Sequence, residues 1–428
     1  MTKPRAGWVA AAAATLLILI HLATHLDEGG WVAKGFPQAT VAIDGHLVQF
    51  EWDDVGSTVA LLYGDQPPAA INTQNVYRFT GPLLIALLCR PLGSLYAAAL
   101  AATVLAWAAA CWSLYTLARL ASGSRAAIAG ALLVATGTGF TAFLGNVDAH
   151  QFGYAAVAIW LATLEALRPL DPQRPLARGW GRLVLAGAGL CVAGYAMEVA
   201  YPLLLFVWLF YGLGALAGLP AQPARAGAVA VRLLLLTAAF ALPYFGFRLL
   251  VEHILFPQVE AFNDPFIRVR ESAALALQRG LAQRLWEWWD LDLKPRWSAD
   301  WPPAVVFLAA AGAAGSLRRP ARLRWTAWAL TSILAVLGAV LLTRPLVRTF
   351  YLASPGIYLL AACGAGDLSA AAQALAQRFL PRRWGAPRTL SALAGALTLT
   401  ALLAAVVLQT NADWWGDYRL PVRWFQTQ

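Results

Sequence analysis

The sequence predicts an all-α polytopic membrane protein with about eleven transmembrane helices, amphipathic surface helices and a small hairpin. Of its 428 residues, 60% are hydrophobic and only 13% are charged, whereas roughly a quarter of an ordinary soluble domain is charged. A soluble fold with so few charges has too little polar surface to cover so much apolar surface. A membrane protein with many spans is the class that fits.

Eleven apolar runs are candidates for these helices, because about twenty apolar residues cross a bilayer. They cover residues 7–26, 95–118, 126–145, 152–167, 183–196, 199–219, 233–251, 302–317, 325–343, 349–366 and 389–409. We interpret residues 1–428 as one membrane domain. Two long loops, 27–94 and 252–301, fall on the same side of it.

The charge distribution predicts the orientation. If the N-terminus is cytoplasmic, the inner segments hold 18 of the 32 Lys and Arg but only 3 of the 22 acids, and the outer segments hold 14 and 19. This is the positive-inside pattern, so the high pI does not imply nucleic acid as a partner. We expect the C-terminus and both long loops outside. The Ala- and Arg-rich composition favours a bacterial inner membrane.

The outer loops contain elements too short to span the membrane. Residues 39–43 and 47–50 flank Asp44-Gly45, a dipeptide typical of a hairpin turn. Amphipathic surface helices are expected at 55–63 and 270–289. A short apolar helix is expected at 81–88, ended by Arg90-Pro91. On the inner side, residues 367–388 predict a basic amphipathic segment lying against anionic lipid.

Paired carboxylates are the strongest chemical signal. Asp53 and Asp54 lie where the first outer loop turns into its surface helix. Such a pair can act as a general base for an acceptor hydroxyl, or it can bind a divalent cation. The alternative is two solvated loop aspartates.

Three further polar residues lie at the outer ends of predicted spans. Asp148 and His150 occupy the short turn between the third and fourth spans. The two side chains could bind a hydroxylated ligand or a metal, or the residues could simply form a tight turn. Glu198 lies between two apolar runs. A carboxylate at membrane depth needs a partner or a wet cavity, which favours a position lining a cavity.

Outer-face arginines oppose the orientation rule. Arg344 and Arg348 lie between the ninth and tenth spans, and Arg248 lies near the outer end of the seventh. Guanidinium groups bind phosphate oxygens through paired hydrogen bonds, so we interpret these residues as phosphate ligands. The alternative is that they reach the lipid head groups. The sequence has no Walker loop or dinucleotide fingerprint, which argues against ATP-driven or hydride-transfer chemistry.

The order of these features resembles the polytopic C-type glycosyltransferases, which take a sugar from a polyprenyl-phosphate carrier at the outer membrane face. An acidic pair opens a surface helix, as at Asp53-Asp54. An aromatic-proline start to a short apolar helix follows at residues 77–88, and a polar turn at 146–151. Residues 348–355 are similar to the late Arg-Tyr-x-x-x-Pro segment of the family. The resemblance covers most of residues 1–170 and the segment 344–366.

The resemblance implies a polyprenyl-phosphate sugar as donor substrate, a lipid, glycan or protein acceptor, and in some members a divalent cation. Asp53 is implied as catalytic base, with Asp54 as neighbour or substitute. Asp27 is a rival, because some members place the acid directly after the first span, although the following Gly29-Gly30 predicts a flexible setting. The resemblance implies Asp148, His150, Arg344 and Arg348 as substrate-binding residues, and Tyr351 lies in the late segment that is similar to the family's. Glu198 and Arg248 are added as substrate-binding candidates on their charge and position alone.

The sequence departs from the family in two ways. Residues 27–50 are an additional piece between the first span and the acidic pair, and the pair is Asp-Asp where Asp-Glu is common. Two other functions remain open, a transporter or flippase for a lipid-linked glycan and a non-catalytic assembly subunit for envelope glycans. Transporters tend to place charges at the midplane, whereas this chain concentrates them at one face, which favours chemistry there.

Overall fold

A computed structural model of the protein describes residues 78–137, 149–197, 200–250, 301–342, 352–379 and 387–417 continuously, with shorter pieces of residues 7–50 and 253–290. The helices in these continuous ranges are α4 (Thr80–Leu92), α5 (Leu95–Ser122), α6 (Ser124–Thr136), α8 (Ala149–Leu167), α9 (Leu176–Met197), α10 (Ala200–Val207), the π-helix η3 (Trp208–Gly212), α11 (Leu213–Gly218), α12 (Pro223–Leu250), α16 (Pro303–Leu317), α17 (Pro320–Leu342), α18 (Ser354–Phe379) and α19 (Pro387–Asp417).

Five helical segments of the described chain are long and apolar enough to cross a membrane. They are Ala97–Ser122, Tyr201–Gly218, Pro223–Leu250, Ser354–Phe379 and Thr389–Gln409. Shorter apolar helices cover Thr80–Leu92, Ser124–Thr136, Gln151–Leu167 and Pro303–Leu317. The multi-pass membrane class predicted from the sequence is therefore confirmed. The number eleven and the orientation stay predictions.

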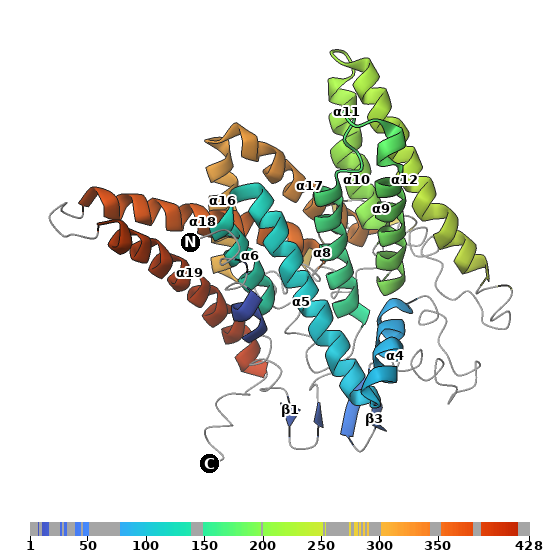
Figure 1. Ribbon diagram of the computed structural model, residues 1–428, viewed down its shortest axis with the longest axis horizontal. Helices are drawn as coiled ribbons and strands as arrows, with labels where there is room; N and C mark the ends of the chain where they lie inside the picture. Colours follow the sequence, from blue (N-terminus) through green and yellow to red (C-terminus); the bar gives the residue numbers. More distant parts are fainter. Residues whose placement is uncertain are drawn as a thin grey trace.

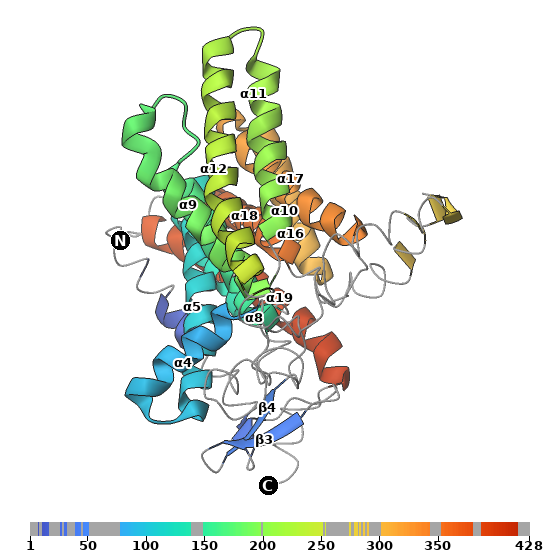
Figure 2. The same cartoon turned by 90° about the vertical axis from the view of Figure 1, so that its right-hand side faces the viewer.

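The molecule has two distinct ends. Helix α4 and the strands lie at one end, and the turn between α11 and α12 lies at the other (Figure 1). The turn between α16 and α17 points the same way as the α11–α12 turn in both perpendicular views (Figures 1 and 2). We call these the α4 end and the turn end. The charge distribution predicts that the α4 end is outside and the turn end cytoplasmic.

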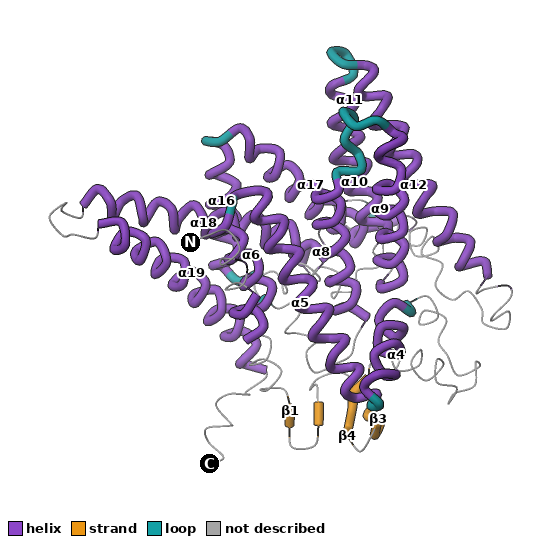
Figure 3. The backbone as a smooth tube through the Cα atoms, in the orientation of Figure 1, coloured by secondary structure: helices purple, strands orange, loops and turns teal. Residues whose placement is uncertain are grey.

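The predicted hairpin is present at the α4 end (Figure 3). Strands β3 (Ala39–Ile43) and β4 (His46–Phe50) pair antiparallel, with Val41 opposite Val48. Two short strands, β1 (Leu26–Asp27) and β2 (Gly30–Trp31), extend the sheet in the order β1-β2-β4-β3, with β2 parallel to β4. The hairpin therefore belongs to a four-stranded sheet, which alternation within residues 39–50 alone could not predict.

Two predicted boundaries are wrong. Helix α4 continues through Arg90 and Pro91 and ends at Leu92, because Gly93 adopts a left-handed φ of 65° and donates its N–H to Cys89 O. Helix α18 does not stop at residue 366 but runs on to Phe379. The first half of the predicted basic segment therefore continues α18.

Close helix packing builds the core. A Cβ added at Gly312 of α16 would lie 2.0 Å from Leu360 O, and one at Gly364 of α18 would lie 2.0 Å from Leu308 O. Glycine at both positions lets the two backbones approach directly, as small residues do between membrane helices. Trp107 of α5 is buried and donates to Val134 O of α6. Helices α5, α6, α16 and α18 thus form the framework for the ends of the other helices.

This packing predicts the effect of a larger residue. Gly312→Val should lower the free energy of unfolding by about 1–3 kcal/mol, because the added carbons overlap the α18 backbone. Gly338→Ala on α17 is the matched control, since a Cβ there meets nothing within 4 Å. Thermal unfolding in detergent should show a clear loss for the first variant only. Equal midpoints would contradict the close approach.

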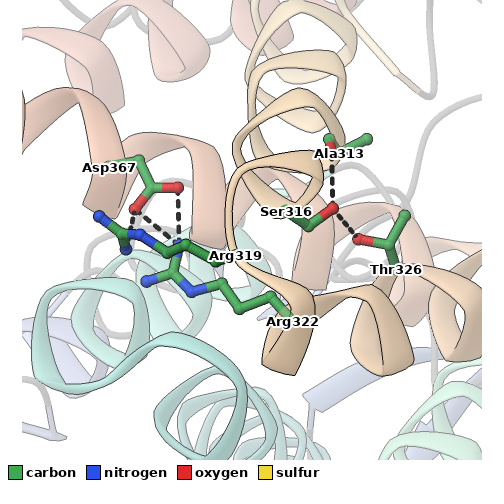
Figure 4. Close-up of polar contacts among 6 residues, drawn as sticks. All are labelled: Ala313, Ser316, Arg319, Arg322, Thr326 and Asp367. Carbon is green, nitrogen blue, oxygen red and sulfur yellow. Dashed lines mark hydrogen bonds and ion pairs between the residues drawn. The ribbon is translucent and has the colours of Figure 1, made fainter.

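Acids predicted to lie on the inner side are paired at the turn end. Asp367 of α18 accepts hydrogen bonds from Arg322 at 2.7 Å and Arg319 at 3.2 Å (Figure 4). Beside them, Thr326 Oγ1 donates to Ser316 Oγ at 2.7 Å, which joins α17 to α16 (Figure 4). These ion pairs explain why α18 tolerates a carboxylate inside its continuous helix.

Candidate functional site

Aromatic rings join three helix ends near α4. Phe79, directly before α4, lies 4.7 Å from Tyr195 of α9 and 5.0 Å from Phe247 of α12 between ring centroids. Tyr195 also meets Phe247 edge-on at 5.2 Å and stacks on Tyr244 at 4.9 Å. The start of α4 and the ends of α9 and α12 therefore form one aromatic cluster.

Hydrogen bonds fix this cluster. The Tyr195 hydroxyl donates to Tyr244 O at 2.7 Å, and Thr80 Oγ1 donates to Val192 O at 3.0 Å. Tyr244 belongs to α12, which continues through Pro243. The Tyr195 side chain thus links α9 to the backbone of α12 and holds the two helix ends together.

Two arginines flank the contact between Phe79 and Phe247. Arg78 precedes Phe79 and is only 6% exposed, and Arg248 follows Phe247 and is half-buried. A guanidinium taken out of water needs a well-placed partner, and both residues interact with other parts of the protein. Arg248 was predicted as a site residue. Arg78 was missed, although a cation before an apolar helix on the predicted outer side was a usable signal.

The first turn of α8 packs on the same end. A Cβ added at Gly81 of α4 would lie 2.4 Å from the Phe152 ring, so α4 and α8 touch where both begin. Gln151 is fully buried and donates to Thr103 Oγ1 at 3.0 Å. The backbone of His150, the second residue of α8, is therefore held next to the start of α4.

Most predicted site residues lie outside the described part of the chain. These are Asp53, Asp54, Asp148, Glu198, Arg344, Arg348 and Tyr351. Their positions in the chain are nevertheless informative, because Asp148 directly precedes α8 and Glu198 directly follows α9. The structure brings the start of α8 and the end of α9 to the start of α4. The positions and the roles of Asp148 and Glu198 themselves stay predictions.

A metal site stays a prediction as well. No group of three or more His, Cys, Asp or Glu side chains is gathered in the part of the chain that the structure describes. The ligands suggested by the sequence, Asp53, Asp54, Asp148 and His150, lie outside it or have side chains that it does not describe.

These elements define a helical membrane fold in which several helix ends and a small sheet lie at the same end of the molecule. No protein-family model matches the sequence, and no curated protein sequence does. Solved structures do match. One is ArnT from Cupriavidus metallidurans bound to undecaprenyl phosphate, with a TM-score of 0.52 and 16% identity over 95% of this chain and 73% of that one.

A second structure with the same fold is the archaeal oligosaccharyltransferase AglB from Archaeoglobus fulgidus, in complex with an inhibitory peptide and a dolichol-phosphate. Its TM-score is 0.51 at 14% identity, covering 93% of this chain. This chain spans only 56% of the length of AglB. The resemblance to C-type glycosyltransferases is therefore confirmed at the level of the fold.

Proposed function

We propose that this protein is an integral-membrane glycosyltransferase that moves a sugar from a polyprenyl phosphate to an acceptor at the α4 end, on the outer face. The observation that carries the proposal is the fold shared with ArnT over 95% of the chain, because that structure holds undecaprenyl phosphate. AglB is an oligosaccharyltransferase solved with dolichol-phosphate. Two proteins with this fold thus bind the class of lipid that the sequence predicts as donor.

The aromatic cluster at the α4 end supports this function. A sugar phosphate needs aromatic or apolar faces for the ring and cations for the phosphate. The rings of Phe79, Tyr195 and Phe247 meet here, and Arg78 precedes Phe79 and Arg248 follows Phe247 in the chain. Guanidinium groups suit phosphate because their paired N–H groups match its oxygens. The donor head group is proposed to lie near this cluster.

The proposed transfer needs a base and a stabilised leaving group. Asp53 or Asp54 takes the proton from the acceptor hydroxyl, whose oxygen forms a bond to the anomeric carbon of the sugar. The bond between that carbon and the phosphate oxygen breaks, and the lipid phosphate leaves with the electron pair. Arg344 and Arg348 would stabilise the negative charge that develops on this phosphate.

Sugar transfer can be tested with the purified full-length protein. Undecaprenyl phosphate carrying a radiolabelled hexose or pentose is incubated with the protein and with lipid, glycan and peptide acceptors in parallel. Label appearing in one acceptor pool supports transfer. Binding of undecaprenyl phosphate without label transfer to any pool would favour a transporter or an assembly subunit. If the lipid does not bind at all, the proposal fails.

The donor phosphate prediction is specific to two arginines. Arg344→Ala or Arg348→Ala should weaken donor binding by at least about 2 kcal/mol, because the phosphate loses a charge-assisted contact. Lysine should restore only part of the affinity, since it cannot form the bidentate contact. The control is Arg318→Ala, an exposed arginine at the turn end. Wild-type affinity for the labelled donor in both variants would remove these residues from the site.

The orientation is also testable. Reporter fusions after residues 221 and 319, at two turns of the turn end, should report a cytoplasmic location, because the inner segments carry the basic excess. Fusions within 27–94 and 252–301 should report the outside. A cytoplasmic location for either long loop would overturn the orientation and, with it, the outer-face reaction.

A further inference from the structure

A cavity of about 690 Å³ lies at the turn end, away from the aromatic cluster. Its walls come from the turn between α8 and α9, from η3 and α11, and from the start of α12, and Arg324 of α17 completes it. Its volume falls in the range of small-ligand sites, roughly 300–1,000 Å³. Nothing in the proposed transfer reaction uses this cavity.

The cavity is basic and its positive charge is only partly neutralised. Of its charged residues, Asp171 pairs with Arg174 at 3.6 Å, and Arg324 pairs with Glu165 at 2.8 Å. Arg168 and Arg225 also line it, and neither has an acidic partner in the described part of the chain. Two guanidinium groups from different elements thus lack a neutralising carboxylate, and Arg225 donates one hydrogen bond to Gln222 Oε1 at 3.1 Å.

The backbone of Arg168 is held in an unusual conformation. Its φ is 47°, a left-handed value normally left to glycine at the end of a helix. Its N–H donates to Leu164 O and closes α8. A non-glycine residue there costs free energy, so the structure keeps an arginine where glycine would cap the helix better. This observation points to a use for the side chain.

Several contacts hold Arg324 in the wall of the cavity. The Arg324 guanidinium lies 5.8 Å from the centroid of Phe210 and 5.1 Å from that of Trp325, and the Tyr211 hydroxyl donates to the buried Glu165. Burial disfavours the charge on Arg324, but the neighbouring Glu165 and Tyr211 outweigh it and raise the pKa of Arg324. Phe210 and Tyr211 belong to η3, and π-helical turns recur at functional sites.

The helices beside the cavity present apolar side chains outward. Leu213 and Leu216 of α11 are 56% and 63% exposed, and Leu234 of α12 is 60% exposed. Such side chains suit lipid tails when the helices stand in a bilayer. A basic pocket bordered by lipid-facing helices is the arrangement that binds anionic head groups on the cytoplasmic side of membrane proteins.

We propose that this cavity binds the phosphate head group of an anionic membrane lipid from the leaflet at the turn end. Arg168 and Arg225 contact the phosphate oxygens, and the neutralised Arg324–Glu165 pair forms the neighbouring wall of the cavity. The acyl chains leave along α11 and α12. This site is separate from the donor site, so it stands whether or not the proposed transfer is correct.

The test uses native mass spectrometry of the full-length protein in detergent, with phosphatidylglycerol and phosphatidylcholine as probes. Wild-type protein should bind phosphatidylglycerol more tightly. Arg168→Gly and Arg225→Gln should each weaken that binding about tenfold, the size expected for one charge-assisted hydrogen bond. Arg318→Gln is the matched control, because this exposed arginine lies at the same end outside the cavity.

Arg168→Gly also separates binding from folding. Glycine suits the left-handed φ, so the melting temperature in lipid-free detergent should stay equal or rise while lipid binding falls. Unchanged lipid binding in both cavity variants overturns the proposal, and so does an equal loss in Arg318→Gln. Competition by water-soluble glycerol phosphate at equal concentration would show that a free anion is the ligand, which also overturns it.

Discussion

Replacing both Asp53 and Asp54 with asparagine is expected to lower sugar transfer by about 10²–10⁴-fold, the usual effect of losing a general base. Asparagine keeps the size and much of the hydrogen bonding of each side chain but cannot accept the acceptor's proton. The protein should still insert and fold. Initial rates of label transfer from the polyprenyl-phosphate donor, measured beside the donor affinity, give the effect.

The single variants assign the base. If only Asp53→Asn loses the rate, Asp54 serves another purpose, such as capping the predicted helix that follows. Asp44→Asn is the control, because this residue lies between β3 and β4, where Asp is favoured for backbone reasons. Near-normal transfer in the double variant would exclude the pair, and Asp27 would be tested next.

The structure changes the argument about Asp27. The two glycines after it predicted a flexible segment, but Asp27 is the last residue of β1 and pairs with Gly30 of β2. Its backbone is therefore fixed in the sheet at the α4 end. Asp27 is a stronger rival base than the sequence alone indicated, although the sheet does not make it a better match to an acidic pair that opens a surface helix.

Local patterns predicted the helices and the β3–β4 hairpin because apolar runs and an Asp-Gly turn are properties of neighbouring residues. What they missed depends on partners distant in the chain. Asp367 interrupts an apolar run, so the sequence ended a helix there, yet Arg319 and Arg322 neutralise it and α18 continues. The position of Phe79 beside Phe247 likewise depends on how the start of α4 packs against α12.

The candidate site was also predicted from local signals, and the sequence revealed only part of it. The structure brings α4, α8, α9 and α12 together at one end, and the spacing of residues in the sequence does not reveal this convergence. The cavity at the turn end was not predicted, since Arg168, Arg225 and Arg324 each counted only as inner-side positive charge. At this cavity Glu165 of α8 pairs with Arg324 of α17, two residues that lie far apart in the sequence.

That pair carries the largest expected effect on stability. The Glu165 side chain is 1% exposed, and its Oε2 accepts from Arg324 Nη2 at 2.8 Å. Arg324→Met should lower the free energy of unfolding by about 3 kcal/mol, because a buried carboxylate loses its cation. The arginine is 45% exposed, which sets this expectation at the low end of the range for buried pairs. Chemical unfolding in mixed micelles without added lipid measures it.

A second substitution tests whether the stranded charge is the cause. Glu165→Gln in the Arg324→Met background should recover at least about 1 kcal/mol, because a neutral amide costs less to bury and can still accept from Tyr211. Arg319→Met is the matched control and should cost no more than about 1 kcal/mol, since Arg319 is 56% exposed and Asp367 keeps Arg322. Equal losses for the two arginine variants, or no recovery in the double variant, would mean that Arg324 stabilises the fold through its ring contacts rather than its charge.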